Sequence, residues 1–394
     1  MSLYFISFFL QVACGAVASY SQLVMRNNGL THSVIGVIRA TGQLATIFFP
    51  LLISGITEKK SKEKLVLIIC LILGLGFYVP VFFSSSILLV FICYFLFSSF
   101  FWSMNPISDG YLTKCCDGNP QLYGKLRSVG TAGYVIFMIL FAVTGFPDEA
   151  DNYQILLNCL ILGFVLLVCY VFGPKYKIQN VKTEQADKGK FDLKWISKPF
   201  MLFLIPVSIS RISTAIIDNF LPSYMTEELN LGSSFTLFIA IGAIGEIVML
   251  TIGGRLQKED RIKPTTLLSL SCLALVLRLI MYVLFKNIVM FILAQLLHAF
   301  TFAGCHSACT SYISKYVSKE NYSKAMTLYW CLGINFPLLI GTLLGGFIID
   351  NHGYNTLFLF YTIFPAFSFF LLILFKGVIN RVQVQKMLDR AENI

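Results

Sequence analysis

Eight ionisable residues lie inside long apolar segments of this chain, where an ordinary membrane helix would hold only apolar side chains. A charge in hydrocarbon is costly, so such residues usually face an aqueous cavity, pair with one another and carry ions or substrate. A passive membrane anchor would not need them, and their presence indicates a transporter. The eight residues are Asp109, Arg127, Arg211, Asp218, Glu246, Arg278, His298 and His306.

The first candidate site is an acid and an arginine, Asp109 and Arg127, which stand 18 residues apart on two predicted antiparallel helices. A tight hairpin would bring both side chains to a similar depth. A carboxylate and a guanidinium that face one cavity can hold a polar ligand, because arginine offers a planar fork of donors. A structural ion pair between the two helices is the alternative interpretation.

The second candidate site combines Glu246, Arg278 and His298, which lie on three different predicted helices. Such a cluster suits proton coupling, because a carboxyl group holds its proton more firmly when it is desolvated and less firmly beside an arginine. A histidine can act as donor or relay near neutral pH. We expect Glu246 or Asp218 to carry the proton, and we include His306 among the coupling residues. A buried charge network that only fixes helix packing is the alternative.

Other polar residues in the apolar segments have more than one interpretation. Arg211 and Asp218 are seven residues apart and share one face of a helix, so Asp218 either lines the cavity or lies near the surface as a gate. His306 has cysteines beside it, but no second ligand cluster accompanies it, so we expect neither a metal nor another cofactor. Arg39 lies a short way inside a predicted span, from where its long stem can carry the charge to the membrane surface.

The composition excludes a soluble globular protein. The chain has 394 residues, of which 57% are hydrophobic and only 13% are charged, and its mean hydropathy is +0.76. The net charge of +10 comes from lysines and arginines in short loops, so membrane topology explains it better than nucleic-acid binding. The 11 cysteines have no regular spacing and are interpreted as small buried residues without a disulfide framework.

Twelve apolar stretches of about 20 residues are each long enough to cross a hydrocarbon core about 30 Å thick. They predict an all-α, polytopic membrane protein, because an open sheet could not satisfy its backbone in lipid. Lysines and arginines concentrate in every second loop, so the positive-inside rule predicts a cytoplasmic (inner) membrane protein with both termini in the cytoplasm. The predicted spans are 2–25, 33–57, 64–82, 87–113, 126–146, 153–173, 198–226, 234–255, 263–285, 287–313, 323–350 and 354–376.

A lysine-rich polar stretch divides the twelve spans into two sets of six. We expect an N-terminal half at 1–173, a cytoplasmic linker at 174–197 and a C-terminal half at 198–394. Weak internal similarity supports this division, because Tyr123-Gly-Lys125 recurs as Tyr322-Ser-Lys324 at an offset of 199 residues. Two six-helix halves with a site between them resemble the arrangement of the major facilitator superfamily. We expect the protein to work as a monomer.

The fourth and fifth spans resemble one branch of that superfamily. Asp109 is followed by Tyr123-Gly-Lys-Leu-Arg127 and then by Gly130-Thr-Ala-Gly133-Tyr134, a succession similar to that of the lactose permease and phenylpropionate permease branch. The resemblance implies that the acid and the arginine hold the substrate. It also implies that Tyr134 stacks against the substrate.

The C-terminal spans carry the same resemblance. Glu246, Arg278 and His298 fall where the lactose permease has its buried glutamate, arginine and histidine, which implies a role in proton coupling. Thr301 follows His298 by about one turn, as in the phenylpropionate permease-like members, whereas the lactose permease has an acid there.

These observations together predict a proton-coupled symporter that imports a small organic solute by alternating access. The solute is a sugar, a nucleoside or an aromatic acid, and Arg211 joins Asp109, Arg127 and Tyr134 as an expected contact because it can pair with a carboxylate. The chain has no nucleotide-binding loop and no nucleophile–base pair, so neither an ATP-driven pump nor an enzyme is expected. An exporter of amphipathic compounds on the same fold and a non-transporting membrane receptor are the alternatives.

Overall fold

The computed structural model describes residues 2–57, 63–116, 120–174, 196–259, 261–284, 288–317 and 321–391. Throughout these ranges the regular structure is helical and no strand occurs, so the predicted all-α class is confirmed. The predicted linker at 174–197 lies outside the described residues except for its first residue and its last two.

The first part of the chain forms seven helices. They are α1 (Ser2–Asn27), α2 (His32–Thr57), α3 (Glu63–Phe83), α4 (Ile87–Phe101), α5 (Met104–Cys115), α6 (Pro120–Thr144) and α7 (Asn152–Phe172). The second part contains α8 (Lys198–Ser223), η1 (Tyr224–Glu228), η2 (Gly232–Ser234), α9 (Phe235–Lys258), α10 (Pro264–Leu284), α11 (Ile288–Leu296), η3 (Ala299–Gly304), α12 (Cys305–Tyr316), α13 (Tyr322–Leu328), η5 (Tyr329–Asn335) and α14 (Phe336–Ala391).

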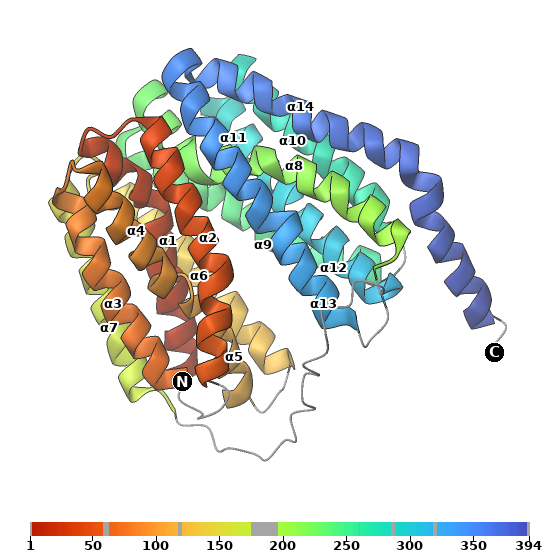
Figure 1. Ribbon diagram of the computed structural model, residues 1–394, viewed down its shortest axis with the longest axis horizontal. Coiled ribbons are helices and arrows are strands. Elements are labelled where there is room, and N and C mark those ends of the chain that lie inside the picture. The colour runs from red at the N-terminus through yellow and green to blue at the C-terminus, as the bar shows by residue number, and fades with distance from the viewer. Residues whose placement is uncertain are drawn as a thin grey trace.

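Eleven stretches of the described chain are long and apolar enough to cross a membrane, and the last of them, Lys324–Ile379, has 56 residues. A straight helix of that length would be about 84 Å long, far more than a hydrocarbon core about 30 Å thick. Gly353 interrupts it with a φ of 75° and a ψ of 176°, and Figure 1 shows α14 turning back on itself. The last stretch therefore holds two spans, and the twelve predicted crossings are present.

Three of the spans are interrupted along their length. Pro106 has no N–H, and its ring crowds the carbonyl of Trp102, where α4 has just ended. Pro337 of α14 likewise lacks an N–H, and its ring crowds the carbonyl of Gly333, which lies in the π-helix η5. The tenth span contains the π-helix η3, which widens the helix directly after His298.

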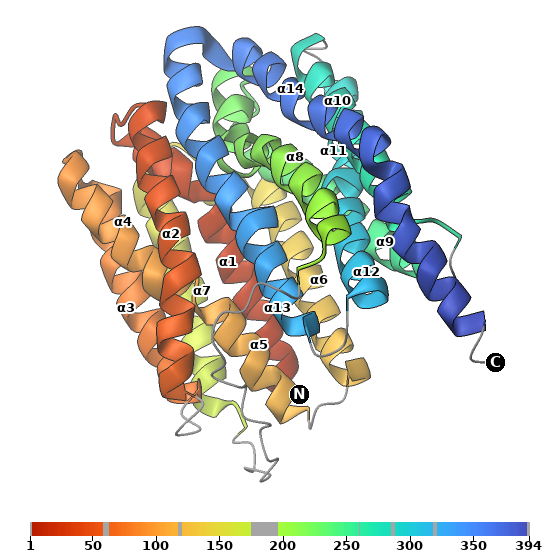
Figure 2. The same ribbon diagram turned by 45° about the vertical axis from the view of Figure 1, so that its right-hand side comes forward.

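The helices form two groups, α1 to α7 and α8 to α14. Within the first group α1 packs against α6 and α7, and within the second α14 packs against α8 and α10. The two groups meet where α2 packs against the first part of α14 and where α6 packs against α9 (Figures 1 and 2). An added Cβ on Gly346 would collide with the carbonyl of His32, so a residue without a side chain is required where α14 meets α2.

The two groups share a hydrophobic core at the end of the bundle opposite the N-terminus, which we call the Arg26 end because α1 finishes there (Figure 1). One hydrophobic core runs through the first group and continues into the second at this end, through Ile216, Phe220 and Tyr224 of the α8–η1 segment. A separate core, built only from the second group, includes Phe203 and Tyr312. The two groups thus share a core at the Arg26 end, whereas Phe203 and Tyr312 belong to a core of the second group alone.

Candidate functional site

A cavity of about 260 Å³ lies between the two groups of helices. Its apolar lining consists of Ala18, Ile217, Leu221, Pro222, Ile239 and Gly242, and its polar lining of Ser19, Tyr134, Asp218, Arg278, Gln295 and His298. The first group contributes residues of α1 and α6, and the second contributes the remainder from α8 to His298. Tyr134, Asp218, Arg278 and His298 are therefore the predicted site residues that reach this cavity.

Arg278 is the centre of a hydrogen-bond network on the cavity wall. Its side chain is 1% exposed. Its Nε donates to the hydroxyl of Tyr282 at 2.8 Å, and its Nη2 donates to Oε1 of Gln295 at 2.9 Å. Its Nη1 donates to Nδ1 of His298 at 2.9 Å and to the hydroxyl of Thr301 at 3.3 Å. The guanidinium is thus held by four neutral groups on one side of the cavity.

The bond from Arg278 determines which nitrogen of His298 carries its proton. A guanidinium is a donor only, so Nδ1 of His298 must accept, and we assign the proton of the neutral ring to Nε2. Nε2 lies 3.8 Å from Oε2 of Glu246. The two side chains are 21% and 25% exposed. The structure therefore brings together the three residues that the sequence grouped, and it places His298 between Glu246 and Arg278.

Arg211 and Asp218 share a face of α8 but form no ion pair with each other. Arg211 is 2% exposed, and the centre of its guanidinium lies 4.8 Å from the centre of the Phe302 ring. Its Nε and Nη2 have no hydrogen-bond partner among the described residues. Asp218 is exposed and faces the cavity, which supports the first of its two predicted positions.

His306 lies apart from the other predicted coupling residues. Its Nδ1 is 3.0 Å from the hydroxyl of Tyr329. The ring of Phe302 stacks between the two histidines, 6.0 Å from the centre of His298 and 6.4 Å from the centre of His306. In the part of the chain that the structure describes, no hydrogen bond or ion pair links His306 to Glu246.

The predicted pair Asp109 and Arg127 is formed, with 3.4 Å between Oδ1 and Nη1. The pair is open to solvent, with exposed fractions of 36% for the aspartate and 50% for the arginine side chain. Neither residue lines the cavity, whereas Tyr134, two turns further along α6, does. The sequence thus identified the pair correctly, but the structure separates it from the cavity lining.

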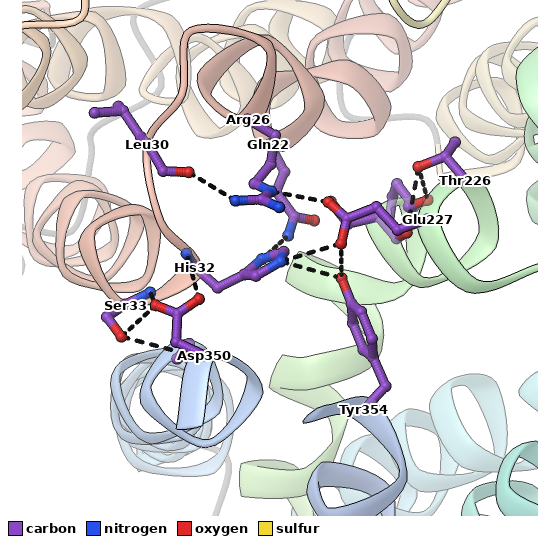
Figure 3. A network of polar contacts seen from close by, with 12 residues as sticks. Gln22, Arg26, Leu30, His32, Ser33, Thr226, Glu227, Asp350 and Tyr354 are labelled. Atoms are coloured by element: carbon purple, nitrogen blue, oxygen red, sulfur yellow. Dashed lines mark hydrogen bonds and ion pairs between the residues drawn. The ribbon is translucent and has the colours of Figure 1, made fainter. Parts of the chain in front are cut away.

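A polar cluster joins the two groups at the Arg26 end (Figure 3). Nε of Arg26 donates to Oε1 of Glu227 at 2.8 Å, and the hydroxyl of Tyr354 donates to Oε2 of the same carboxylate at 3.0 Å. Nε2 of His32 lies 3.2 Å from that second oxygen. Arg26 and His32 belong to the first group of helices, whereas Glu227 and Tyr354 belong to the second.

The same cluster caps a helix of one group with a carboxylate from the other. Asp350 of α14 accepts hydrogen bonds from the backbone N–H groups of His32 at 3.0 Å and Ser33 at 2.7 Å, and from the Ser33 hydroxyl at 2.6 Å. The first N–H groups of a helix have no partner within it and favour a negative charge. We call Arg26, His32, Ser33, Glu227, Asp350 and Tyr354 the polar bridge.

A model of the MFS_1 like family matches residues 1–360. The chain belongs to the MFS_1 like family. It is 23% identical over 353 residues to the probable 3-phenylpropionic acid transporter of Escherichia coli (strain K12), covering 89% of this chain and 91% of that protein. It is 21% identical over 354 residues to the uncharacterized transporter YwbF of Bacillus subtilis (strain 168), covering 88% and 85% respectively.

Solved structures agree with this assignment. A crystal structure of a mutant of the nucleoside transporter NupG superposes with a TM-score of 0.80 at 18% identity, covering 94% of this chain and 98% of that one. This likeness concerns the fold. Together with the family match, it makes the protein a multi-pass membrane transporter of small solutes and not an enzyme.

Several polar residues of this MFS_1 like transporter were not singled out from the sequence. Gln295 and Tyr282 hold Arg278, and every member of the polar bridge lies near the end of a span, where polar residues are ordinary.

One prediction was wrong. Arg39 does not extend to the membrane surface: it is 8% exposed, and its Nε donates to Oδ1 of Asn219 at 2.6 Å. A partner on α8 holds the charge inside, which the pattern of a single helix could not reveal.

Proposed function

We propose that this MFS_1 like transporter is a proton-coupled symporter that imports a small organic solute across the cytoplasmic membrane. The observation that carries the proposal is the succession of contacts from Glu246 to His298 and from His298 to Arg278, the last two of which line the cavity. A carboxyl group beside the substrate's path, held next to a histidine of defined tautomer, is a suitable site for one transported proton.

In this proposal Glu246 carries the proton and His298 orients it. A second proton on His298 would make Nδ1 a donor that faces the donor of Arg278, so the bond between them keeps the ring neutral. The Nε2–H group can then approach the charged carboxylate of Glu246 and lose that contact when the carboxylate is protonated. Asp218, which faces the same cavity, is the second carboxylate that can serve.

Alternating access follows from the two groups of helices, which we identify with halves at 1–173 and 198–394 that work within one monomer. The positive loops support an orientation with both termini in the cytoplasm. The polar bridge and the shared core would then close the external side, and this conformation would face inward. Opening to the outside would require the contacts of Glu227 and Asp350 to break.

The proposed substrates are a sugar, a nucleoside or an aromatic acid. One relative is named as a probable 3-phenylpropionic acid transporter and one structural neighbour as a nucleoside transporter, so both kinds of solute are reasonable probes. Tyr134 lies in the cavity and can stack on a ring. Asp109 and Arg127 would meet the solute on its way out of the cavity, whereas Arg211 could do so only after the Phe302 ring moved.

Uptake into proteoliposomes tests the proposal. Purified protein is reconstituted, and entry of labelled uridine, glucose or 3-phenylpropionate is followed with an inward proton gradient, without one, and with a protonophore. We expect accumulation of one solute only with the gradient. Uptake that ignores the gradient would refute proton coupling, and solute binding without counterflow would identify a receptor. Gradient-driven extrusion would identify an exporter.

A further inference from the structure

Asp218 is the charged residue of the cavity whose hydrogen-bonding capacity is unused. Its carboxylate is exposed toward the cavity and has no hydrogen bond or ion pair within the described ranges of the chain. An ionised carboxylate can only accept hydrogen bonds. A ligand that satisfies Asp218 must therefore supply O–H or N–H donors.

Arg278, the other charged group of the lining, has no guanidinium nitrogen left without a protein partner to bind a ligand. Its three nitrogens donate to Tyr282, Gln295, His298 and Thr301, and Nε2 of Gln295 in turn donates to the Tyr282 hydroxyl at 3.3 Å. A ligand carboxylate could gain this guanidinium only by displacing neutral acceptors that hold it from behind. Those acceptors would then be left buried without their donor, which is unfavourable.

Arg211 is not available to a ligand in this cavity either. It is 2% exposed, does not belong to the lining, and lies against the ring of Phe302. A ligand carboxylate in the cavity would instead lie beside Asp218, and two carboxylates that share a site disfavour each other's charge. Asp218, which lacks a donor, and Arg278, whose donors are already used, thus both disfavour an anionic solute.

We propose that the substrate is a neutral hydroxylated ring compound, a sugar or a nucleoside, whose hydroxyl groups donate to Asp218. This inference rests on the proposed function and narrows it. The cavity lining also includes Tyr134, Ile217 and Leu221, whose apolar surfaces suit the apolar face of such a ring. A volume of about 260 Å³ is slightly below the range of roughly 300–1,000 Å³ typical of drug-sized ligands and fits a solute of one or two rings.

The proposal differs from what one relative's name would suggest. The probable 3-phenylpropionic acid transporter is only 23% identical to this chain, and an aromatic acid offers Asp218 no donor once it is ionised. A test therefore has to compare solutes that differ in a carboxylate and in little else.

Binding to the purified full-length protein in detergent, followed by thermal shift and titrated for affinity, provides that test. The probes are glucose with glucuronate, uridine with uridine 5′-carboxylate, and 3-phenylpropionate. We expect glucose or uridine to stabilise the protein and its carboxylate counterpart to bind at least about tenfold more weakly. Equal or tighter binding of the carboxylates, or failure of both hydroxylated probes, would overturn the proposal.

Two variants assign the effect to Asp218. Asp218→Asn keeps the shape of the side chain but replaces one acceptor oxygen with a donor. The affinity for the hydroxylated probe should therefore fall about tenfold, and the difference in affinity between this probe and its carboxylate counterpart should shrink. Asp148→Asn changes an exposed loop carboxylate and should leave both affinities as they are. Unchanged binding by Asp218→Asn would overturn the assignment.

If Asp218→Asn does not fold, the comparison of hydroxylated and carboxylate probes on the wild-type protein still tests the proposed substrate class, because it needs no variant. Binding needs no proton gradient, so the outcome is separate from the test of coupling. Solute uptake that ignores a proton gradient would refute the symport mechanism and leave the preference for hydroxylated solutes intact.

Discussion

The polar bridge and the central cavity use charged residues in opposite ways. In the bridge, the carboxylates of Glu227 and Asp350 each accept hydrogen bonds from the other group of helices. In the cavity, Asp218 has no protein partner in the described chain, and Arg211 rests on an aromatic ring. The carboxylates of the polar bridge are satisfied by protein groups, whereas Asp218 and two nitrogens of Arg211 have no hydrogen-bond partner among the described residues.

This difference separates structural charges from working ones. A buried ionic group without a partner is costly, so a fold retains one where a ligand or another conformation completes it. Arg278 has features of both kinds. Protein groups satisfy its donors, as in the polar bridge, but its partner His298 also faces Glu246 near the cavity. The following variants change the cavity wall, the polar bridge, the α2–α14 contact and the Asp109–Arg127 pair one at a time.

The largest effect is expected from Arg278→Lys. A lysine cannot reach Tyr282, Gln295 and His298 at once, so buried acceptors lose their donor, at a cost of about 1–3 kcal/mol for each. We expect a clearly lower melting temperature and no gradient-driven uptake. Arg261→Lys, at an arginine whose side chain is 70% exposed, is the matched control and should change stability by less than about 0.5 kcal/mol. Equal stability of the two variants would contradict the role of Arg278 as the centre of the network.

The next largest effect is expected from Glu227→Gln in the polar bridge. The amide loses the charge that Arg26 and His32 face, so opening at the Arg26 end should become about tenfold easier. A cysteine in place of Ala18, on the cavity wall, reports this opening through its labelling rate with a membrane-impermeant maleimide, after the native reactive cysteines have been removed. An unchanged labelling rate would mean that the bridge does not hold this end closed.

A smaller effect is expected from Gly346→Ala. The new methyl group would meet the backbone of His32, which cannot rotate away, so unfolding free energy should fall by about 1–3 kcal/mol. Gly377→Ala is the control, because nothing lies within 4 Å of a Cβ there and the helix gains propensity. Chemical or thermal unfolding of both variants measures the difference, and a Gly346→Ala protein as stable as its control would refute the close α2–α14 contact.

The smallest effect on stability is expected from Arg127→Lys. The arginine is 50% exposed, so loss of its contact with Asp109 should change the unfolding free energy by less than about 1 kcal/mol. Solute transport should nevertheless slow by at least about tenfold, because the solute that leaves the cavity past this pair would meet a lysine, which has no planar fork. Thermal unfolding and solute counterflow of one preparation separate the two quantities. A normal counterflow rate would assign the pair to helix packing alone.

Much of the fold was predictable because hydropathy acts locally. The first span, predicted at 2–25, is observed at Ser2–Asn27. The interruptions at Pro106 and at the π-helix η3 were not predicted within their spans. The grouping of Glu246, Arg278 and His298 was also predictable, because each is an isolated charge in an apolar segment and the resemblance placed all three together.

The remaining contacts were not predictable because they join distant parts of the chain. His32 and Asp350 are 318 residues apart, and each looks like an ordinary polar residue at the end of a span. Arg39 was misread for the same reason, since Asn219 lies 180 residues away. Arg211 and Asp218 share a helix face, as their spacing predicted, but only the structure shows that the ring of Phe302 covers the arginine.

The central claim is that Glu246 carries the proton that moves with the solute. The most direct measurement is solute-driven proton uptake by proteoliposomes, followed with a pH electrode in weakly buffered medium, for the wild type and for Glu246→Gln. We predict that solute makes the medium more alkaline with the wild type but not with Glu246→Gln, while solute counterflow continues in both. Proton uptake by Glu246→Gln at the wild-type rate would contradict the account.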